Sequence, residues 1–185
     1  RATNKKSCLL CCVPCACRRR CARVQKLEYF MNTLDNAEHL ADFPNLVELA
    51  VHLEKVPRIL GLHNKQQLLR LCMTECGLKR MGGCEHCVQL THLDLSHNKL
   101  AEMEPDVLSH LGRLKTLWLN DNAIERVQGL EACGLLSCLW LGANRIVGLC
   151  DALSASTHLE ELNLAGNLIS NFKDIPNLAR MRRLS

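Results

Sequence analysis

The stretch Leu114 to Ile124, L-K-T-L-W-L-N-D-N-A-I, contains the residue spacing that recurs through most of this chain. Its frame is L-x-x-L-x-L-x-x-N-x-I. The same frame appears over residues 136–146 and 159–169, and over residues 90–100 with Leu100 in place of the final isoleucine. Leucines at alternating positions of a short strand point to the same side, and a repeat of this size cannot bury them alone. The pattern therefore predicts a solenoid in which parallel strands stack along one face.

The repeat continues in both directions when the second leucine of each frame is taken as a marker. Successive markers lie 22 to 24 residues apart. We expect repeats over residues 21–185, about seven of them with an eighth cut short. Because the chain begins with Arg1 and stops as this eighth repeat begins, we also expect it to be part of a longer chain. The markers are Leu27, Leu49, Leu71, Leu93, Leu117, Leu139, Leu162 and Leu184.

A polar position lies five residues after each marker, in the turn that follows the strand. The backbone groups of this turn are buried and need partners, and an asparagine can both donate to them and accept from them. We therefore expect a ladder of asparagines, with repeats two and three the least regular because Glu54 and Cys76 replace the amide there. The residues at this position are Asn32, Glu54, Cys76, Asn98, Asn122, Asn144 and Asn167.

The second part of each repeat has apolar residues at a spacing of three. This spacing predicts short 3₁₀ or loosely helical turns on the convex side rather than full α-helices. The expected inward residues are Val127, Leu130, Cys133 and Leu136 in one repeat, and Phe172, Ile175, Leu178 and Met181 in another.

Four stretches resemble a known family. They are F-P-N-L-V-E-L-A-V (43–51), L-C-M-T-E-C-G-L-K-R-M-G-G (71–83), L-K-T-L-W-L-N-D-N-A-I-E-R-V-Q-G-L (114–130) and L-E-E-L-N-L-A-G-N-L-I-S (159–170). They are similar to the first repeat block of the leucine-rich repeat-containing protein 9 family, whose members are long multi-repeat proteins of ciliated organisms. The resemblance covers roughly residues 24–185.

The 22-residue intracellular class of leucine-rich repeats is also similar to the phosphatase-1 regulatory subunit and to the axonemal dynein leucine-rich light chain. Both use the solenoid to grip a partner protein. The resemblance implies an α/β leucine-rich repeat solenoid, with a curved parallel sheet on the concave face and short 3₁₀ or helical turns on the convex face. It further implies a non-enzymatic scaffold in the cytoplasm, at the cytoskeleton of the cilium or axoneme.

The charge of the chain is unevenly distributed. The formal net charge is +4, but residues 1–26 contain eight Lys and Arg and no acidic residue. From residue 27 onward the chain contains fifteen basic and nineteen acidic residues. The repeats are therefore slightly acidic, which disfavours direct contact with nucleic acid. No apolar run reaches eighteen residues, so we expect no membrane span.

The leader, residues 1–20, reads R-A-T-N-K-K-S-C-L-L-C-C-V-P-C-A-C-R-R-R and differs from the repeats. We expect a poorly ordered segment. Zinc binding and palmitoylation are the alternatives. The zinc ligands would be Cys8, Cys11, Cys12 and Cys15.

The motif Cys84-Glu85-His86-Cys87, with Cys72 and Cys76 upstream, has the spacing of a zinc or redox site. The repeat register instead places Cys76, Cys84 and Cys87 inside, in different layers, and only Cys72 outside. A buried free cysteine acts as a small apolar residue, so we expect packing and no metal. The chain has no glycine-rich phosphate loop, no H-E-x-x-H motif and no nucleophile elbow. We therefore expect that it binds no cofactor, has no catalytic residues and is not an enzyme.

The concave face is the most informative surface that the register predicts. The chain has two tryptophans, Trp118 and Trp140, and both directly follow a marker in consecutive repeats. Because neighbouring strands lie about 4.8 Å apart, the indoles should stack. The outward row of residues that follow the markers is Glu28, Ala50, Cys72, Asp94, Trp118, Trp140 and Asn163, and the flanking rows add His92, Ser96, Thr116, Asn120, Asp121 and Glu161.

Two interpretations of the tryptophans are open. Aromatic anchors with a polar rim are typical of protein-binding sites, whereas a tryptophan ladder can also simply stiffen a sheet. We favour the first interpretation, in which the chain binds a partner protein of the axonemal or phosphatase type. The alternative functions for the chain are a regulatory subunit of protein phosphatase 1 and a spliceosomal leucine-rich repeat subunit. The predicted binding residues are Trp118, Trp140, Asp94, Asn163, His92, Thr116, Asn120 and Glu161.

Overall fold

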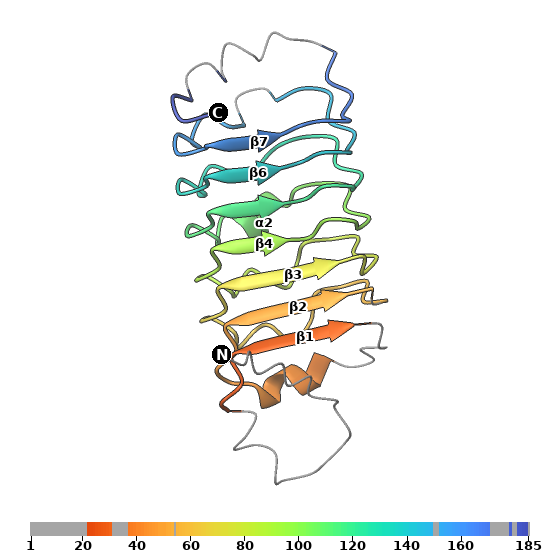
Figure 1. Ribbon diagram of the computed structural model, residues 1–185, viewed down its shortest axis with the longest axis vertical. Helices are drawn as coiled ribbons and strands as arrows, with labels where there is room; N and C mark the ends of the chain where they lie inside the picture. Colours follow the sequence, from red (N-terminus) through yellow and green to blue (C-terminus); the bar gives the residue numbers. More distant parts are fainter. Residues whose placement is uncertain are drawn as a thin grey trace, which may run out of the picture.

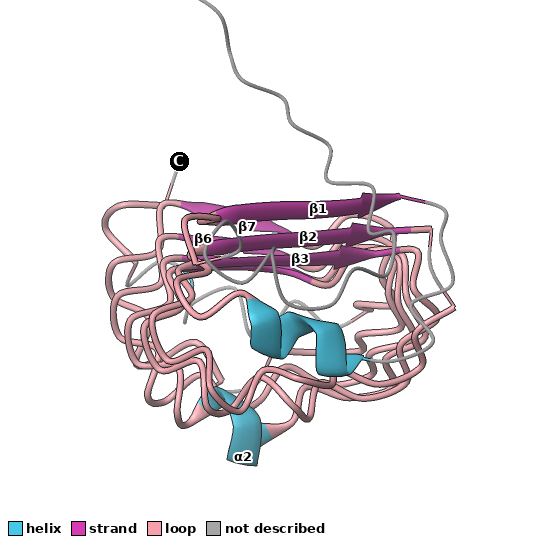
Figure 2. Cartoon of the chain, turned by 90° about the horizontal axis from the view of Figure 1, so that it is seen from below, coloured by secondary structure: helices cyan, strands magenta, loops and turns pink. Residues whose placement is uncertain are grey.

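The chain folds into a solenoid with one parallel sheet along its length (Figure 1). The computed structural model describes residues 22–30, 37–53, 55–149, 152–170, 178 and 181–184. Seven strands follow one another in chain order, and the return segments lie on the opposite side from the sheet (Figure 2). The predicted parallel solenoid is confirmed. The leader and its cysteines lie outside the described residues.

The strands differ in length between the two ends of the sheet. The first three have five residues each and the last four have three. They are β1 (Lys26–Phe30), β2 (Glu48–His52), β3 (Arg70–Thr74), β4 (His92–Asp94), β5 (Thr116–Trp118), β6 (Cys138–Trp140) and β7 (Glu161–Asn163).

The return segments are mostly turns, as the spacing of three predicts. A 3₁₀ helix, η1 (Ala37–Asp42), lies after β1, and a single α-helical turn, α2 (Pro105–Leu108), lies after β4. Pro105 stands in the first turn of α2, where a helix does not need its N–H. Figure 2 shows α2 at the edge away from the sheet, whereas η1 is drawn between the strands and the outer turns. No described helix is long and apolar enough to cross a membrane.

The core lies between the sheet and the return segments. The marker leucines are paired in register from Leu27 to Leu162. All are buried except Leu162, which is partly buried at the last described strand. Burying each leucine contributes about 1.5 to 3 kcal/mol. The return residues Val127, Leu130, Cys133, Leu136 and Met181 are buried and Leu178 is partly buried, as predicted, while Phe172 and Ile175 lie outside the described residues.

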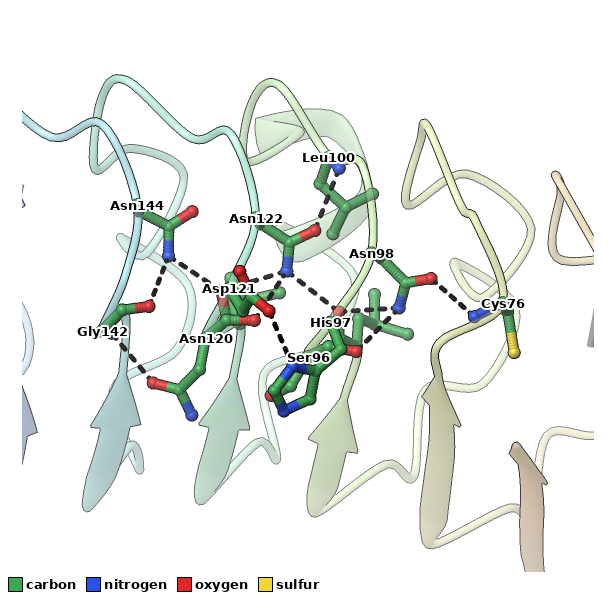
Figure 3. Close-up of polar contacts among 12 residues, drawn as sticks. Cys76, Ser96, His97, Asn98, Leu100, Asn120, Asp121, Asn122, Gly142 and Asn144 are labelled. Atoms are coloured by element: carbon green, nitrogen blue, oxygen red, sulfur yellow. Dashed lines mark hydrogen bonds and ion pairs between the residues drawn. The ribbon is translucent and has the colours of Figure 1, made fainter. Parts of the chain in front are cut away.

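An asparagine ladder holds the turns that follow the strands (Figure 3). The Asn144 side chain donates to the Leu119 and Leu141 carbonyl oxygens, each at 2.9 Å, and accepts from the Ile124 N–H at 3.0 Å. Asn98, Asn122 and Asn167 make the same type of contacts to their own turn and to the preceding repeat. The expected ladder is therefore present from Asn98 to Asn167.

The ladder is weaker at Cys76, the earlier ladder position that lies within the described residues. The Cys76 thiol donates to the Val51 carbonyl at 3.5 Å and to the Thr74 carbonyl at 3.4 Å. A thiol is a weaker donor than an amide, and Cys76 offers no side-chain oxygen as acceptor. Asn32 and Glu54, the other two early positions, lie outside the described residues.

From residue 53 onward, the residue just before each ladder position has a left-handed backbone. Its φ lies between 52° and 58° at five non-glycine residues and is 71° at Gly166. This conformation costs roughly 1 to 2 kcal/mol for a residue with a Cβ. Its recurrence shows that the side-chain ladder and the packing of neighbouring turns impose one turn shape on unfavourable residues. The five are Leu53, Glu75, His97, Asp121 and Ala143.

Lysine 65 and the cysteines of the return segments are the unusual core residues. Cys84 and Cys87 are 0% exposed and Cys76 is 1% exposed, whereas Cys72 is half-buried, as the register predicted. Among the described residues, no three His, Cys, Asp or Glu side chains are grouped to hold a metal ion. Lys65 is 1% exposed, and burial lowers its pKa, with Cys87 and Asp42 acting in the opposite direction.

Candidate functional site

Two stacked indoles stand on β5 and β6, on the open face of the sheet. This is the predicted concave face, and it is called the open sheet face below. Trp118 of β5 and Trp140 of β6 are paired across the strands. Their ring centroids lie 4.8 Å apart and their planes differ by 14°. Both side chains are half-buried. The predicted stacking is confirmed, and each indole covers one face of the other.

The sheet register places the predicted rim residues around this pair. One row runs Asp94, Trp118, Trp140, Asn163 across β4 to β7. Asp94 and Asn163 therefore flank the two indoles. The parallel row across the same four strands contains His92, Thr116, Cys138 and Glu161. The structure thus brings seven of the eight predicted residues onto these two rows, and Asn120 lies two residues after Trp118.

One expected outward residue is not at the surface. Ser96 is only 5% exposed, so its placement on an outward row was wrong. The chain already bends into the turn here, because the Ser96 N–H donates to Asp94 and its carbonyl accepts from the Asn98 amide. Asp121 is exposed on the turn after β5 and pairs with His97 of the turn after β4 at 2.9 Å.

Cys138 belongs to the site although the sequence reasoning did not single it out. The Trp118 indole N–H donates to the Cys138 sulfur at 3.4 Å, and the Cys138 thiol donates to a Glu161 carboxylate oxygen, also at 3.4 Å. Burial raises the pKa of the Cys138 thiol, so the group is neutral at pH 7. Its row position between Thr116 and Glu161 is the sequence signal that could have identified it.

Gly142 is the second residue that the sequence reasoning missed. A Cβ added to Gly142 would lie 3.1 Å from the Asn120 Oδ1 atom and 3.4 Å from both polar atoms of the Asn163 amide. The two amides therefore meet over a glycine beside Trp140. The Gly142 N–H donates to Asn120 at 2.8 Å and the Ala165 N–H donates to Asn163 at 3.0 Å. Both backbone bonds use the amide oxygens and leave the NH₂ groups as donors.

The electrostatics of the open sheet face differ between its two halves. In the first half (residues 22–90), Glu48 pairs with Lys26 and, at 3.9 Å, with Arg70. In the second half (residues 91–170), the rows hold the carboxylates Asp94 and Glu161. Burial lowers the pKa of His92, with Arg70 and Lys115 adding to the shift, so this imidazole is neutral at pH 7. Within the two rows across β4 to β7, the charged residues beside the indoles are therefore the carboxylates Asp94 and Glu161, while Lys115 is the nearby basic residue next to Thr116.

The arrangement favours binding over catalysis. His92 contacts the Thr91 hydroxyl at 2.8 Å rather than a thiol, and Cys138 stays protonated. No nucleophile and base are thus joined on these two rows, as nucleophilic catalysis requires. What the rows offer is two aromatic faces, two carboxylates and two amide donors, which are groups that recognise a ligand.

The sequence model of the leucine rich repeat family matches residues 82–132. The geranylgeranyl transferase type-2 subunit alpha of Bos taurus is 40% identical over 85 residues, which are 45% of this chain and 15% of that protein. The leucine-rich repeats and immunoglobulin-like domains protein 3 of Homo sapiens is 31% identical over 105 residues, or 55% of this chain and 9% of that protein. The chain therefore spans a small part of these relatives.

Solved structures are similar to this chain in fold. A leucine-rich repeat protein of Leptospira interrogans has a TM-score of 0.69 at 20% identity, with 80% of this chain and 38% of that protein covered. The TLR13-ssRNA13 complex gives a TM-score of 0.74 at 20% identity, with 86% and 24% covered. At this identity the likeness concerns the solenoid alone. Solenoids of stacked repeats present extended surfaces on which other molecules can bind.

Proposed function

We propose that this parallel-sheet solenoid is a non-enzymatic scaffold that binds a partner protein on the open sheet face. Trp118 and Trp140 form the centre of the interface, and Asp94, Asn163, His92, Thr116, Asn120 and Glu161 form its rim. The observation that carries this proposal is the stacked, half-buried indole pair inside a polar rim, which has the composition of an interaction hot spot.

The proposed setting is the cytoplasm, at the cytoskeleton of the cilium or axoneme. The resemblance of residues 24–185 to the leucine-rich repeat-containing protein 9 family, and of the repeat class to the axonemal dynein light chain, supports it. A regulatory subunit of protein phosphatase 1 and a spliceosomal subunit use the same architecture and are the alternative functions. We propose no direct contact with nucleic acid, because the repeats are acidic from residue 27 onward.

The test is affinity capture from an extract of ciliated cells, with wild-type chain and the W118A/W140A variant compared by quantitative mass spectrometry. We expect a defined protein that is retained by the wild type and lost from the variant. The identity of the captured partner distinguishes the three functions. It would be an axonemal protein, the catalytic subunit of protein phosphatase 1 or a spliceosomal protein.

A matched control removes two apolar side chains elsewhere. Val147 and Leu168 are 58% and 60% exposed and lie outside the strands, so V147A/L168A should keep the partner. Circular dichroism must show the same fold for all variants. A partner that is captured equally by W118A/W140A would refute the proposed interface.

A further inference from the structure

The carboxylates beside the indoles lack a cationic partner. Asp94 accepts from the Ser96 N–H at 3.0 Å and from the Cys72 thiol at 3.6 Å, and Glu161 accepts from the Cys138 thiol. Thiols are weak donors that bring no positive charge. Within the described part of the chain, neither carboxylate forms an ion pair, whereas Glu48 in the first half contacts two cations.

The stacking direction determines which aromatic surface a ligand can reach. Trp118 and Trp140 cover one face of each other, and they stand between Asp94 and Asn163 in one row. The uncovered face of the Trp118 indole therefore lies on the side of Asp94. A cation over an indole face is attracted by the ring, and a carboxylate beside the ring adds charge-assisted hydrogen bonds.

An arginine fits this combination better than a lysine. A guanidinium is planar, so it can lie flat on an indole while its N–H groups form a fork with a carboxylate. It is also more weakly hydrated than an ammonium group, so a half-buried site strips water from it at lower cost. The surroundings of Trp118 and Asp94 supply both of these contacts.

The amides on the other side of the pair suit a polypeptide backbone. The NH₂ groups of Asn120 and Asn163 have no hydrogen-bond partner among the residues that the structure describes, and both stand next to Gly142. A glycine floor lets a backbone approach closely. Two amide donors there can hold the carbonyl groups of a bound segment, while the carboxylates hold its side chains.

We propose that the second half of the open sheet face recognises a basic segment of the partner protein. In this complex an arginine stacks on the uncovered face of Trp118 and pairs with Asp94, and a further basic residue pairs with Glu161. The inference rests on the proposed function and adds the chemistry of the partner. Complementary charge also makes binding weaker as the salt concentration rises.

Intrinsic fluorescence tests this directly, because the only two tryptophans of the chain are in the site. The probe is a synthetic peptide of alternating glycine and arginine, compared with the same peptide carrying neutral citrulline. We expect the arginine peptide to change the tryptophan fluorescence in a saturable way. The citrulline peptide should bind at least about tenfold more weakly, since each charge-assisted hydrogen bond is stronger than a neutral one. Equal binding of the two peptides, or no change with either, would overturn the proposal.

Site variants locate the effect. D94N/E161Q should weaken binding of the arginine peptide by at least about tenfold, whereas E48Q, which removes a carboxylate from the first half, should leave it unchanged. Circular dichroism should show the same fold for both variants. Equal losses in the two variants would point to a general charge effect and overturn the site. Oligouridine is titrated in parallel, and tighter binding of this RNA than of the peptide, lost in W118A/W140A, would also overturn it.

The two proposals fail in different ways. In affinity capture, a partner lost from W118A/W140A but retained by D94N/E161Q would refute the basic segment and leave the proposed interface standing. A partner retained by both variants would refute the interface itself. A partner lost from both, whose binding region carries arginines required for capture, supports the full inference.

Discussion

The two halves of the solenoid have the same register but are held together differently. The first half has strands of five residues, a thiol at one ladder position and ion pairs across its sheet face. The second half has strands of three residues, a continuous asparagine ladder, and a sheet face with an indole pair and uncompensated acids.

This difference explains where a binding site can form. Where the turns are held by amides, the strand side chains are not needed to join neighbouring repeats and can face a partner. In the first half, cross-strand ion pairs between Lys26, Glu48 and Arg70 use the same surface positions for the fold. The candidate site accordingly lies on β4 to β7.

Substitutions in the asparagine ladder should have the largest effect on stability and therefore test the comparison first. Asn144→Ala should lower the free energy of unfolding by about 2 to 4 kcal/mol, because buried backbone groups at Leu119, Leu141 and Ile124 lose their partner. Cys76→Ala should cost about 1 kcal/mol or less, since the thiol bonds it removes are weak. Urea unfolding followed by circular dichroism measures both. Equal losses would show that the ladder does not distinguish the halves.

A second test uses alkaline pH. Burial raises the pKa of Cys87 to about 12 and of Cys133 to about 11, above the ordinary value of 9.0, and raises that of Cys84 further. The folded state therefore keeps its thiols protonated while the unfolded chain releases the protons. The contribution of these thiols to the free energy of unfolding is therefore fully present below pH 9.0. It is lost as the pH rises from 9.0 toward their pKa values in the folded state.

The expected loss is about 1 kcal/mol for each buried thiol at about pH 10, relative to about pH 8. Lys65 acts in the opposite direction, because its lowered pKa makes burial less costly once the amine is neutral. Two of the three thiols lie in the first half, so C84A/C87A should reduce the alkaline loss about twice as much as C133A. Urea unfolding at the two pH values checks this, and an unchanged loss in C84A/C87A would contradict it.

The smallest effect concerns the sheet-face carboxylates. Glu48→Gln should cost about 0.5 kcal/mol at low salt and less at high salt, because partly exposed ion pairs are weak and screened. Asp94→Asn should change stability by less, since Asp94 has no ion pair among the described residues and asparagine can still accept from the Ser96 N–H. Thermal unfolding at two salt concentrations measures the pair. A larger loss for Asp94→Asn would reverse the assignment of structural and binding roles.

Most of the fold was predictable because a single spacing controls it. The 22-residue register correctly placed the marker leucines, the Asn98 to Asn167 ladder, the buried Cys84 and Cys87, and the stacking of Trp118 on Trp140. It was wrong for Ser96, because period-two alternation ends where the strand bends into its turn. It also missed Cys138 and Gly142, whose roles depend on contacts with the neighbouring repeat.

The sequence alone determined which side chains point inward, because leucine burial leaves only one strand register with its apolar side in the core. Only the tertiary structure decided how the outward side chains interact. Asp94 and Glu161 accept hydrogen bonds from thiols instead of pairing with cations, and two amides meet over Gly142. These contacts join residues about one repeat apart. Such contacts depend on the geometry of the stacked strands, because the neighbours of an outward residue in its row determine which side chains it can contact.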